Sequence, residues 1–153
     1  MDENFEENKD EEQNIIVAVS GYFDPIHIGH IEYFKKSKEL GDKLIVIINN
    51  DNQTMNKKGF VFMPHIERAK IIEELGCVDE IFISIDEDAS VCQSLGQIKP
   101  HIFTQGGDRF NKEVPEAKVC ELHNINMIDQ LGRKIQSSSD LVKKSKEKID
   151  EKQ

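Results

Sequence analysis

Five short apolar runs without polar alternation constrain the fold of this chain more than any other feature. They are IIVAV at 15–19, LIVII at 44–48, IFISI at 81–85, HIFT at 101–104 and a weaker INMI at 125–128. Runs of this kind are typical of parallel strands that are buried on both faces of a sheet. The sequence therefore predicts a parallel five-stranded sheet.

Helical patterns separate these runs. Apolar residues at helical spacing lead up to Gly41, Gly76 and Gly96, so we expect one helix to stop at each glycine. Pro115 suits a first helical position, and the cluster at 137–140 suits the cap of a last helix. Strands that alternate with helices form right-handed crossovers, which predicts an α/β fold: a Rossmann-like, doubly wound sheet with helices on both faces. In such sheets, ligands bind at the carboxyl ends of the strands.

The length and charge distribution predict one domain with two polar extensions. We expect an acidic, disordered arm at 1–13, a folded domain at 14–144 and a polar tail at 145–153. The formal net charge of -9 argues against a nucleic-acid-binding surface, which needs clustered basic residues. The chain has no apolar run long enough to span a bilayer and no signal-peptide pattern, so we expect a cytoplasmic protein without a membrane partner.

The cysteines indicate neither a disulfide framework nor a metal site. Cys77, Cys92 and Cys120 are odd in number and form no CxxC pair. No activating base is near them in the sequence, which disfavours a catalytic thiol. We therefore expect reduced, half-buried core cysteines.

The loop after the first apolar run carries the most specific pattern, SGYFDPIHIGHIEY at 20–33. If a helix begins near residue 28, His27 and His30 project from one edge of its first turn, beside N–H groups without a partner in the helix. They could be metal ligands with Asp24 as a third, ordinary core or capping histidines, or a clamp for an anion. The positive field of a helix N-terminus suits a triphosphate better than a divalent cation.

The pattern GYFDPIHIGH resembles the HxGH signature of the cytidylyltransferase-like nucleotidyltransferases. Other segments match this family in register: LGDKLIV through NNDNQTMNKKG at 40–59, MPHIERAKII at 63–72, VDEI at 78–81, KPHIFTQGGD at 99–108 and KIQSSSDLVKK at 134–144. Together they cover nearly all of residues 15–143. The resemblance implies an enzyme that transfers a nucleoside monophosphate from CTP or ATP to the phosphate of a second substrate and releases pyrophosphate.

The resemblance also implies catalytic roles for two histidines and a lysine. His27 and His30 would hold the triphosphate and stabilise the transition state, and Lys58 would reach the phosphates across the site. Nucleotidyl transfer depends on positioning and on charge placed where charge develops, so it needs no nucleophilic side chain. Without the resemblance, Lys57 and Lys58 would be read as an ordinary solvated loop end.

The remaining candidate site residues also follow from the resemblance. Candidate nucleotide-binding residues are Gly21, Tyr22, Phe23, Asp24, Gly29, Lys57, Gly106, Gly107, Asp108, Arg133, Gln136, Ser137, Ser138 and Ser139. Candidate substrate-binding residues are Asp51, Arg68 and Arg109. Several have simpler structural interpretations: Asp51 as a turn former at the end of the second strand, Arg68 as half of a surface pair, and the serines as helix caps. The resemblance leaves Arg68 two roles, facing the substrate or stabilising the loop around it.

The nucleotide donor is less well defined. NNDNQT, KKG and TQGGD look more like the heptose-phosphate adenylyltransferases, whereas an arginine shortly before SSSDLV is similar to the RTEGISTT run of the glycerol-3-phosphate, choline-phosphate and ethanolamine-phosphate cytidylyltransferases. Arg133 lies one residue closer to the serines than that run requires, and Gln136 replaces its Gly-Ile pair. Together these similarities slightly favour CTP as the nucleotide donor, with ATP as the alternative.

The acceptor, the cofactor and the assembly complete the expectations. The acceptor should be a small phosphorylated alcohol or sugar, and one Mg²⁺ should bridge the phosphates. The resemblance at 78–80 and around Tyr22 implies a homodimer. A non-catalytic nucleotide-binding regulatory module is the alternative from another class, but such a module would be expected to lose part of the histidine, lysine and serine set.

Overall fold

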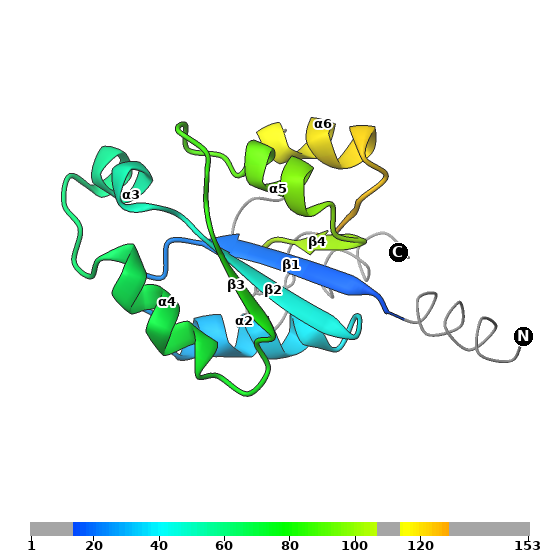
Figure 1. Cartoon of the computed structure of the whole chain (residues 1–153), viewed down its shortest axis with the longest axis horizontal. Helices are drawn as coiled ribbons and strands as arrows, with labels where there is room; N and C mark the ends of the chain where they lie inside the picture. The colour runs from blue at the N-terminus through cyan, green and yellow to red at the C-terminus, as the bar shows by residue number, and fades with distance from the viewer. Residues whose placement is uncertain (1–13, 107–113, 129–153) are drawn as a thin grey trace, which may run out of the picture.

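A computed structural model describes residues 14–106 and 114–128. They form a parallel five-stranded sheet with the strand order β3-β2-β1-β4-β5 (Figure 1). The strands are β1 (Ile16–Gly21), β2 (Lys43–Ile48), β3 (Glu80–Ile83), β4 (Ile102–Thr104) and β5 (Asn126–Ile128). The predicted five-stranded parallel sheet is therefore confirmed. The acidic arm, most of the segment after β4, the expected last helix and the polar tail lie outside the described residues.

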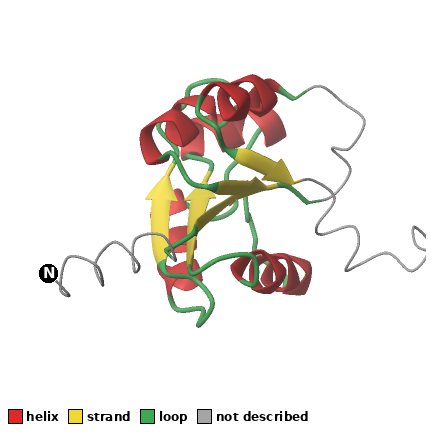
Figure 2. Cartoon of the chain, turned by 90° about the vertical axis from the view of Figure 1, so that its right-hand side faces the viewer, coloured by secondary structure: helices red, strands yellow, loops and turns green. Residues whose placement is uncertain are grey.

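Helices cover both faces of the sheet (Figures 1 and 2). The helices are α2 (Ile28–Lys38), α3 (Asp51–Lys58), α4 (His65–Glu73), α5 (Cys92–Ile98) and α6 (Pro115–Leu122). On one face, Phe34 of α2 and Ile72 of α4 pack against Val17 and Val19 of β1. On the other face, α5, α6 and Ala18 of β1 share a second apolar cluster. Successive residues of one strand thus enter different cores, which explains the lack of polar alternation.

Helix α3 was not predicted, because the sequence pattern indicated a loop there. Asn50 caps α3: its side chain accepts a hydrogen bond from the backbone N–H of Gln53, and the Gln53 side chain accepts one from the N–H of Asn50. Gly59 ends the helix in the left-handed region, at φ 85°. Asp51 is therefore the first residue of a helix, and the expectation that it ends the second strand is wrong.

The predicted stop at Gly96 is also wrong. Helix α5 continues through Gly96 to Ile98 and ends where Lys99 takes a left-handed φ of 51°, directly before Pro100. The predicted start of α6 at Pro115 is confirmed. Among the described residues, no helix is long and apolar enough to cross a membrane.

Candidate active site

The two histidines of the HxGH pattern cap helix α2. His27 is the N-cap residue, and its Nδ1 accepts a hydrogen bond from the backbone N–H of Gly29 at 3.1 Å. The Nδ1 of His30 accepts one from the backbone N–H of His27 at 3.0 Å. The pair therefore forms a reciprocal capping box, in which imidazole nitrogens replace the usual hydroxyl and carboxylate oxygens.

This capping arrangement selects one tautomer for both rings. Because each Nδ1 accepts a backbone hydrogen bond, the proton of each neutral imidazole is on Nε2. The rings are stacked, with centroids 3.8 Å apart and planes inclined by 26°. The two Nε2–H donors thus belong to neighbouring, nearly parallel rings at the positive end of a helix, an arrangement that suits an oxyanion.

Burial keeps His30 neutral. Desolvation, and then repulsion from His27, lower the pKa of His30 from 6.5 to about 4. The His30 and Phe23 rings are nearly perpendicular, with planes inclined by 87° and centroids 4.9 Å apart. At neutral pH the His30 ring therefore carries a neutral Nε2–H dipole and no full positive charge.

Phe23 and Gly21 support the histidines from within the fold. Phe23 is only 3% exposed, and a Cβ atom at Gly21 would lie 2.6 Å from the Phe23 ring. A side chain at Gly21 would thus collide with the Phe23 ring unless that ring moved. The aromatic ring fixes the position of His30.

Asp24 is used inside the protein. Its carboxylate is fully buried, and its two oxygens accept hydrogen bonds from the backbone N–H groups of Phe62 and Met63, at 2.8 and 2.6 Å. The ammonium of Lys58 donates to the carbonyl of Asp24 and lies 3.6 Å from its carboxylate. Asp24 therefore joins the histidine loop to the segment after α3, and as placed here it is not an available metal ligand.

Arg68 connects the histidine loop, the end of β2 and the segment before α4. It is 1% exposed, and it donates hydrogen bonds to the carbonyls of Tyr22, Asn49 and Met63 and to the carboxylate of Asp51. Of the two roles that the resemblance leaves to Arg68, this geometry fits stabilisation of the loop, because the guanidinium is enclosed by protein acceptors. Asp51 likewise accepts from Arg68 and from the N–H of His65.

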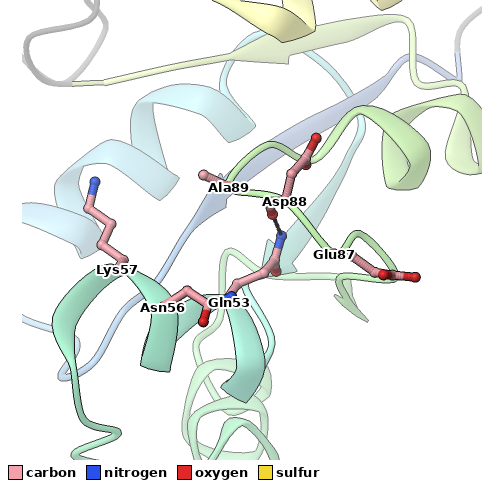
Figure 3. A pocket seen from close by; sticks show the side chains of 6 residues that line it. All are labelled: Gln53, Asn56, Lys57, Glu87, Asp88 and Ala89. Carbon is pink, nitrogen blue, oxygen red and sulfur yellow. Dashed lines mark hydrogen bonds between the residues drawn. The ribbon is translucent and has the colours of Figure 1, made fainter.

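Lys57 lies between the histidine loop and a pocket. Its ammonium is 5.5 Å from the centroid of the Tyr22 ring. The pocket, of about 360 Å³, is also lined by Gln53, Asn56, Glu87, Asp88 and Ala89 (Figure 3). The sequence pattern did not indicate the residues on the far wall of this pocket. The Asn-x-x-Gln spacing at 50–53, which caps α3, is the sequence signal for this pocket.

The structure describes only part of the predicted nucleotide site. Gly106 follows β4 at the carboxyl edge, beside Gln105, whose buried Oε1 has no hydrogen-bond partner among the described residues. The other candidates on this side lie outside the described residues: Gly107, Asp108, Arg109, Arg133, Gln136, Ser137, Ser138 and Ser139. Their roles remain predictions.

The cysteines and possible metal ligands bring no further chemistry to the site. Burial raises the pKa of Cys120 to about 11 and also raises those of Cys77 and Cys92, which disfavours a reactive thiolate. All three cysteines are free. Within 14–106 and 114–128, no group of three or more His, Cys, Asp or Glu side chains could hold a metal ion.

Comparison with known proteins gives matches over most of the chain. The family model described as cytidylyltransferase-like matches residues 18–149. The FAD synthase of Thermoplasma volcanium is 33% identical over 141 residues, which cover 90% of this chain and 98% of that protein. The bifunctional protein HldE of Nitratiruptor sp. is 35% identical over 116 residues, which cover 74% of this chain but only 24% of that longer protein. The chain therefore spans about a quarter of the length of HldE.

Two solved structures share the fold of this chain. The lipopolysaccharide core biosynthesis protein from Thermoplasma volcanium is similar, with a TM-score of 0.63, 29% identity and coverage of 76% of this chain and 95% of that chain. A protein of unknown function from Archaeoglobus fulgidus shares the fold, with a TM-score of 0.58 and 16% identity. From the family match, the full-length similarity to FAD synthase and the histidine geometry, we conclude that this chain belongs to the cytidylyltransferase-like family of nucleotidyltransferases.

Proposed function

We propose that this enzyme transfers a nucleoside monophosphate from CTP or ATP to the phosphate of a small phosphorylated alcohol or sugar. The observation that carries the proposal is the histidine capping box, which leaves the protons of two stacked imidazoles on Nε2 at the N-terminus of α2. A site of this kind is suited to the negative charge that develops on phosphate oxygens. A regulatory module without catalysis would not need two such donors held in one tautomer.

The proposed reaction proceeds in one displacement. An oxygen of the acceptor phosphate attacks the α-phosphorus of the nucleotide and forms a new P–O bond. The bond between the α-phosphorus and the bridging oxygen breaks, and pyrophosphate leaves with that electron pair. His27 and His30 donate hydrogen bonds to the phosphate oxygens throughout, and the ammonium of Lys58 at the end of α3 neutralises charge. No covalent enzyme intermediate is needed.

The identity of the nucleotide donor is the least constrained part of this proposal. The arginine and serine run favours CTP, whereas the similarity to an FAD synthase favours ATP, because that enzyme's name implies transfer of AMP. We propose that the nucleotide lies against the segment after β4, with Gly106, Gly107 and Asp108 on one side. Arg133, Gln136 and the serines at 137–139 would close the other side.

We also propose that the reaction uses Mg²⁺ and that the enzyme is a homodimer. Mg²⁺ is commonly bound mainly by substrate phosphates and water, with one or two carboxylates. The described residues fit such an ion only as a companion of the triphosphate, because the Asp24 oxygens already accept backbone hydrogen bonds. When bound, Mg²⁺ would supply charge neutralisation for the phosphates.

A pyrophosphate-release assay tests the proposed function. CTP and ATP are each supplied with a panel of sugar and alcohol phosphates, and the wild type is compared with His27→Ala and His30→Ala. We expect each variant to lose on the order of 100-fold in rate because it lacks one oxyanion donor. His123→Ala, at the end of α6, is the matched control and should retain activity. Turnover at the wild-type rate in either site variant would contradict the mechanism.

A further inference from the structure

The pairing between β1 and β4 ends before either strand does. Within the described residues, β1 pairs with β4 at two positions, the second being Ala18 with Phe103, whereas it pairs with β2 as far as Gly21. Thr104, the last residue of β4, pairs with Ile128 of β5. The carboxyl end of β4 therefore continues alongside β5 and no longer pairs with β1. In open α/β sheets, a switch point of this kind is where ligands bind.

Two side chains of α2 contact the end of β4. The hydroxyl of Tyr33 donates a hydrogen bond to the backbone carbonyl of Thr104 at 2.6 Å, and the Thr104 hydroxyl lies 3.5 Å from that of Tyr33. The hydroxyls of Ser37 and Thr104 are 2.9 Å apart, within hydrogen-bond distance. Tyr33 is 6% exposed, and Ser37 and Thr104 are fully buried. Because water is excluded here, the loss of one hydroxyl leaves its partner poorly satisfied.

This contact joins the two halves of the proposed nucleotide site. Tyr33 lies three residues after His30, one turn further along the helix whose N-terminus the histidines cap. Thr104 ends the strand that leads to Gly106 and the segment where we place the nucleoside. The Tyr33 hydroxyl therefore connects the helix that presents the phosphate donors to the backbone from which the nucleoside side begins.

The separation between these halves matters for the reaction. A nucleoside triphosphate in this site is held by its phosphates at the histidines and by its nucleoside beside β4. The α-phosphorus lies between the two, so its position depends on both. A misplacement of about 1 Å can cost roughly 100-fold in rate, even when its cause lies far from the reacting atoms.

We propose that Tyr33 is a positioning residue that sets the distance between the triphosphate half and the nucleoside half of the site. The inference rests on the proposed function. Tyr33 acts through the Thr104 carbonyl, which fixes where the chain leaves β4. The histidines are held by their own capping box. Removal of the Tyr33 hydroxyl should therefore disturb the nucleoside half and leave the phosphate half in place.

Equilibrium binding to the full chain tests this role. The probes are CTP, ATP and inorganic pyrophosphate, each with Mg²⁺, and isothermal titration calorimetry measures their Kd values. Tyr33→Phe removes the hydroxyl and retains the aromatic ring. It should weaken binding of the preferred nucleotide about tenfold, roughly the effect of one hydrogen bond. It should change pyrophosphate binding less than twofold, because pyrophosphate occupies only the phosphate half.

Ser37→Ala is the matched control on the same helix. It removes a fully buried hydroxyl from the same cluster, and it keeps the bond from Tyr33 to the Thr104 carbonyl. Thermal unfolding of both variants measures what each change costs in stability. A general loosening of the fold would weaken binding of all three probes and would affect both variants. Ser37→Ala should change the Kd of each probe less than twofold.

The outcomes separate this inference from the proposed function. Weaker nucleotide binding confined to Tyr33→Phe, with pyrophosphate binding unchanged, would support the positioning role. Three results would overturn that role and leave nucleotidyl transfer intact: unchanged nucleotide binding in Tyr33→Phe, equal weakening of nucleotide and pyrophosphate, or an equal loss in Ser37→Ala. A wild type that bound neither CTP nor ATP would contradict the proposed function, and the positioning role with it.

Discussion

At the scale of single residues, the histidine pair links the stability of the fold to pH. Burial and repulsion from His27 hold the pKa of His30 at about 4, below its ordinary value of 6.5. The unfolded chain therefore binds more protons than the folded chain between these values. The contribution of neutral His30 to the free energy of unfolding is complete above pH 6.5, and it is lost as the pH falls toward 4.

We therefore expect the wild type to lose stability between pH 7 and pH 5 to a greater extent than His30→Asn. The difference should be on the order of 1 kcal/mol, a value reduced for solvent screening of a ring that is only partly buried. Urea unfolding at the two pH values measures it. An equal pH dependence in the variant would show that His30 is not the group responsible.

Arg68 is a second residue whose role depends on buried contacts. Arg68→Met removes the guanidinium that donates to the Tyr22 and Asn49 carbonyls, and it also removes the contact with Asp51. We expect a loss of about 3 kcal/mol in the free energy of unfolding. Lys70→Met, an exposed change on the same helix, should cost less than about 0.5 kcal/mol. Similar losses in the two variants, measured by urea unfolding, would contradict the structural role of Arg68.

At the scale of elements, α3 shows what sequence patterns could and could not reveal. The strands were predicted because each is a local apolar run, and α2 because its start carries a recognisable signature. Helix α3 has no apolar stripe, and its buried residues, Gln53 and Thr54, are both polar. Its stability depends on caps and on bonds to a loop more than 30 residues away, such as the 35-residue separation between Gln53 and Asp88. No local pattern indicates contacts of that kind.

The two functions of Asn50 can be separated by one substitution. Asn50→Ser keeps an oxygen that can cap α3, but it removes the side-chain donor to the Ser84 and Asp86 carbonyls. We expect a loss of about 1–2 kcal/mol in stability and faster amide hydrogen exchange in the loop after β3. Asn52→Ser, exposed on the same helix, is the control. Unchanged exchange in the loop would show that Asn50 does not hold the pocket wall.

At the scale of the whole molecule, the sheet order assigns different tasks to its two sides. The sequence predicted five parallel strands and a site at their carboxyl ends, and the structure describes the histidine and lysine side of that site. The order β3-β2-β1-β4-β5 was not predicted, because pairing between distant strands depends on packing of the whole chain. That order places β1, which leads to the histidines, between β2 and β4.

The acidic arm allows a whole-molecule test of charge. Residues 2–12 contain seven acids and Lys9, a sum of -6, so removing them changes the formal net charge from -9 to -3. A tethered negative segment lowers the local concentration of a polyanionic nucleotide, but salt screens this effect over about 8 Å at physiological ionic strength. We expect the truncated enzyme to have a lower nucleotide KM at low salt and the wild-type rate at 0.15 M salt, roughly physiological. A large loss of activity on truncation, measured by pyrophosphate release, would instead mean that the arm contributes directly to the site.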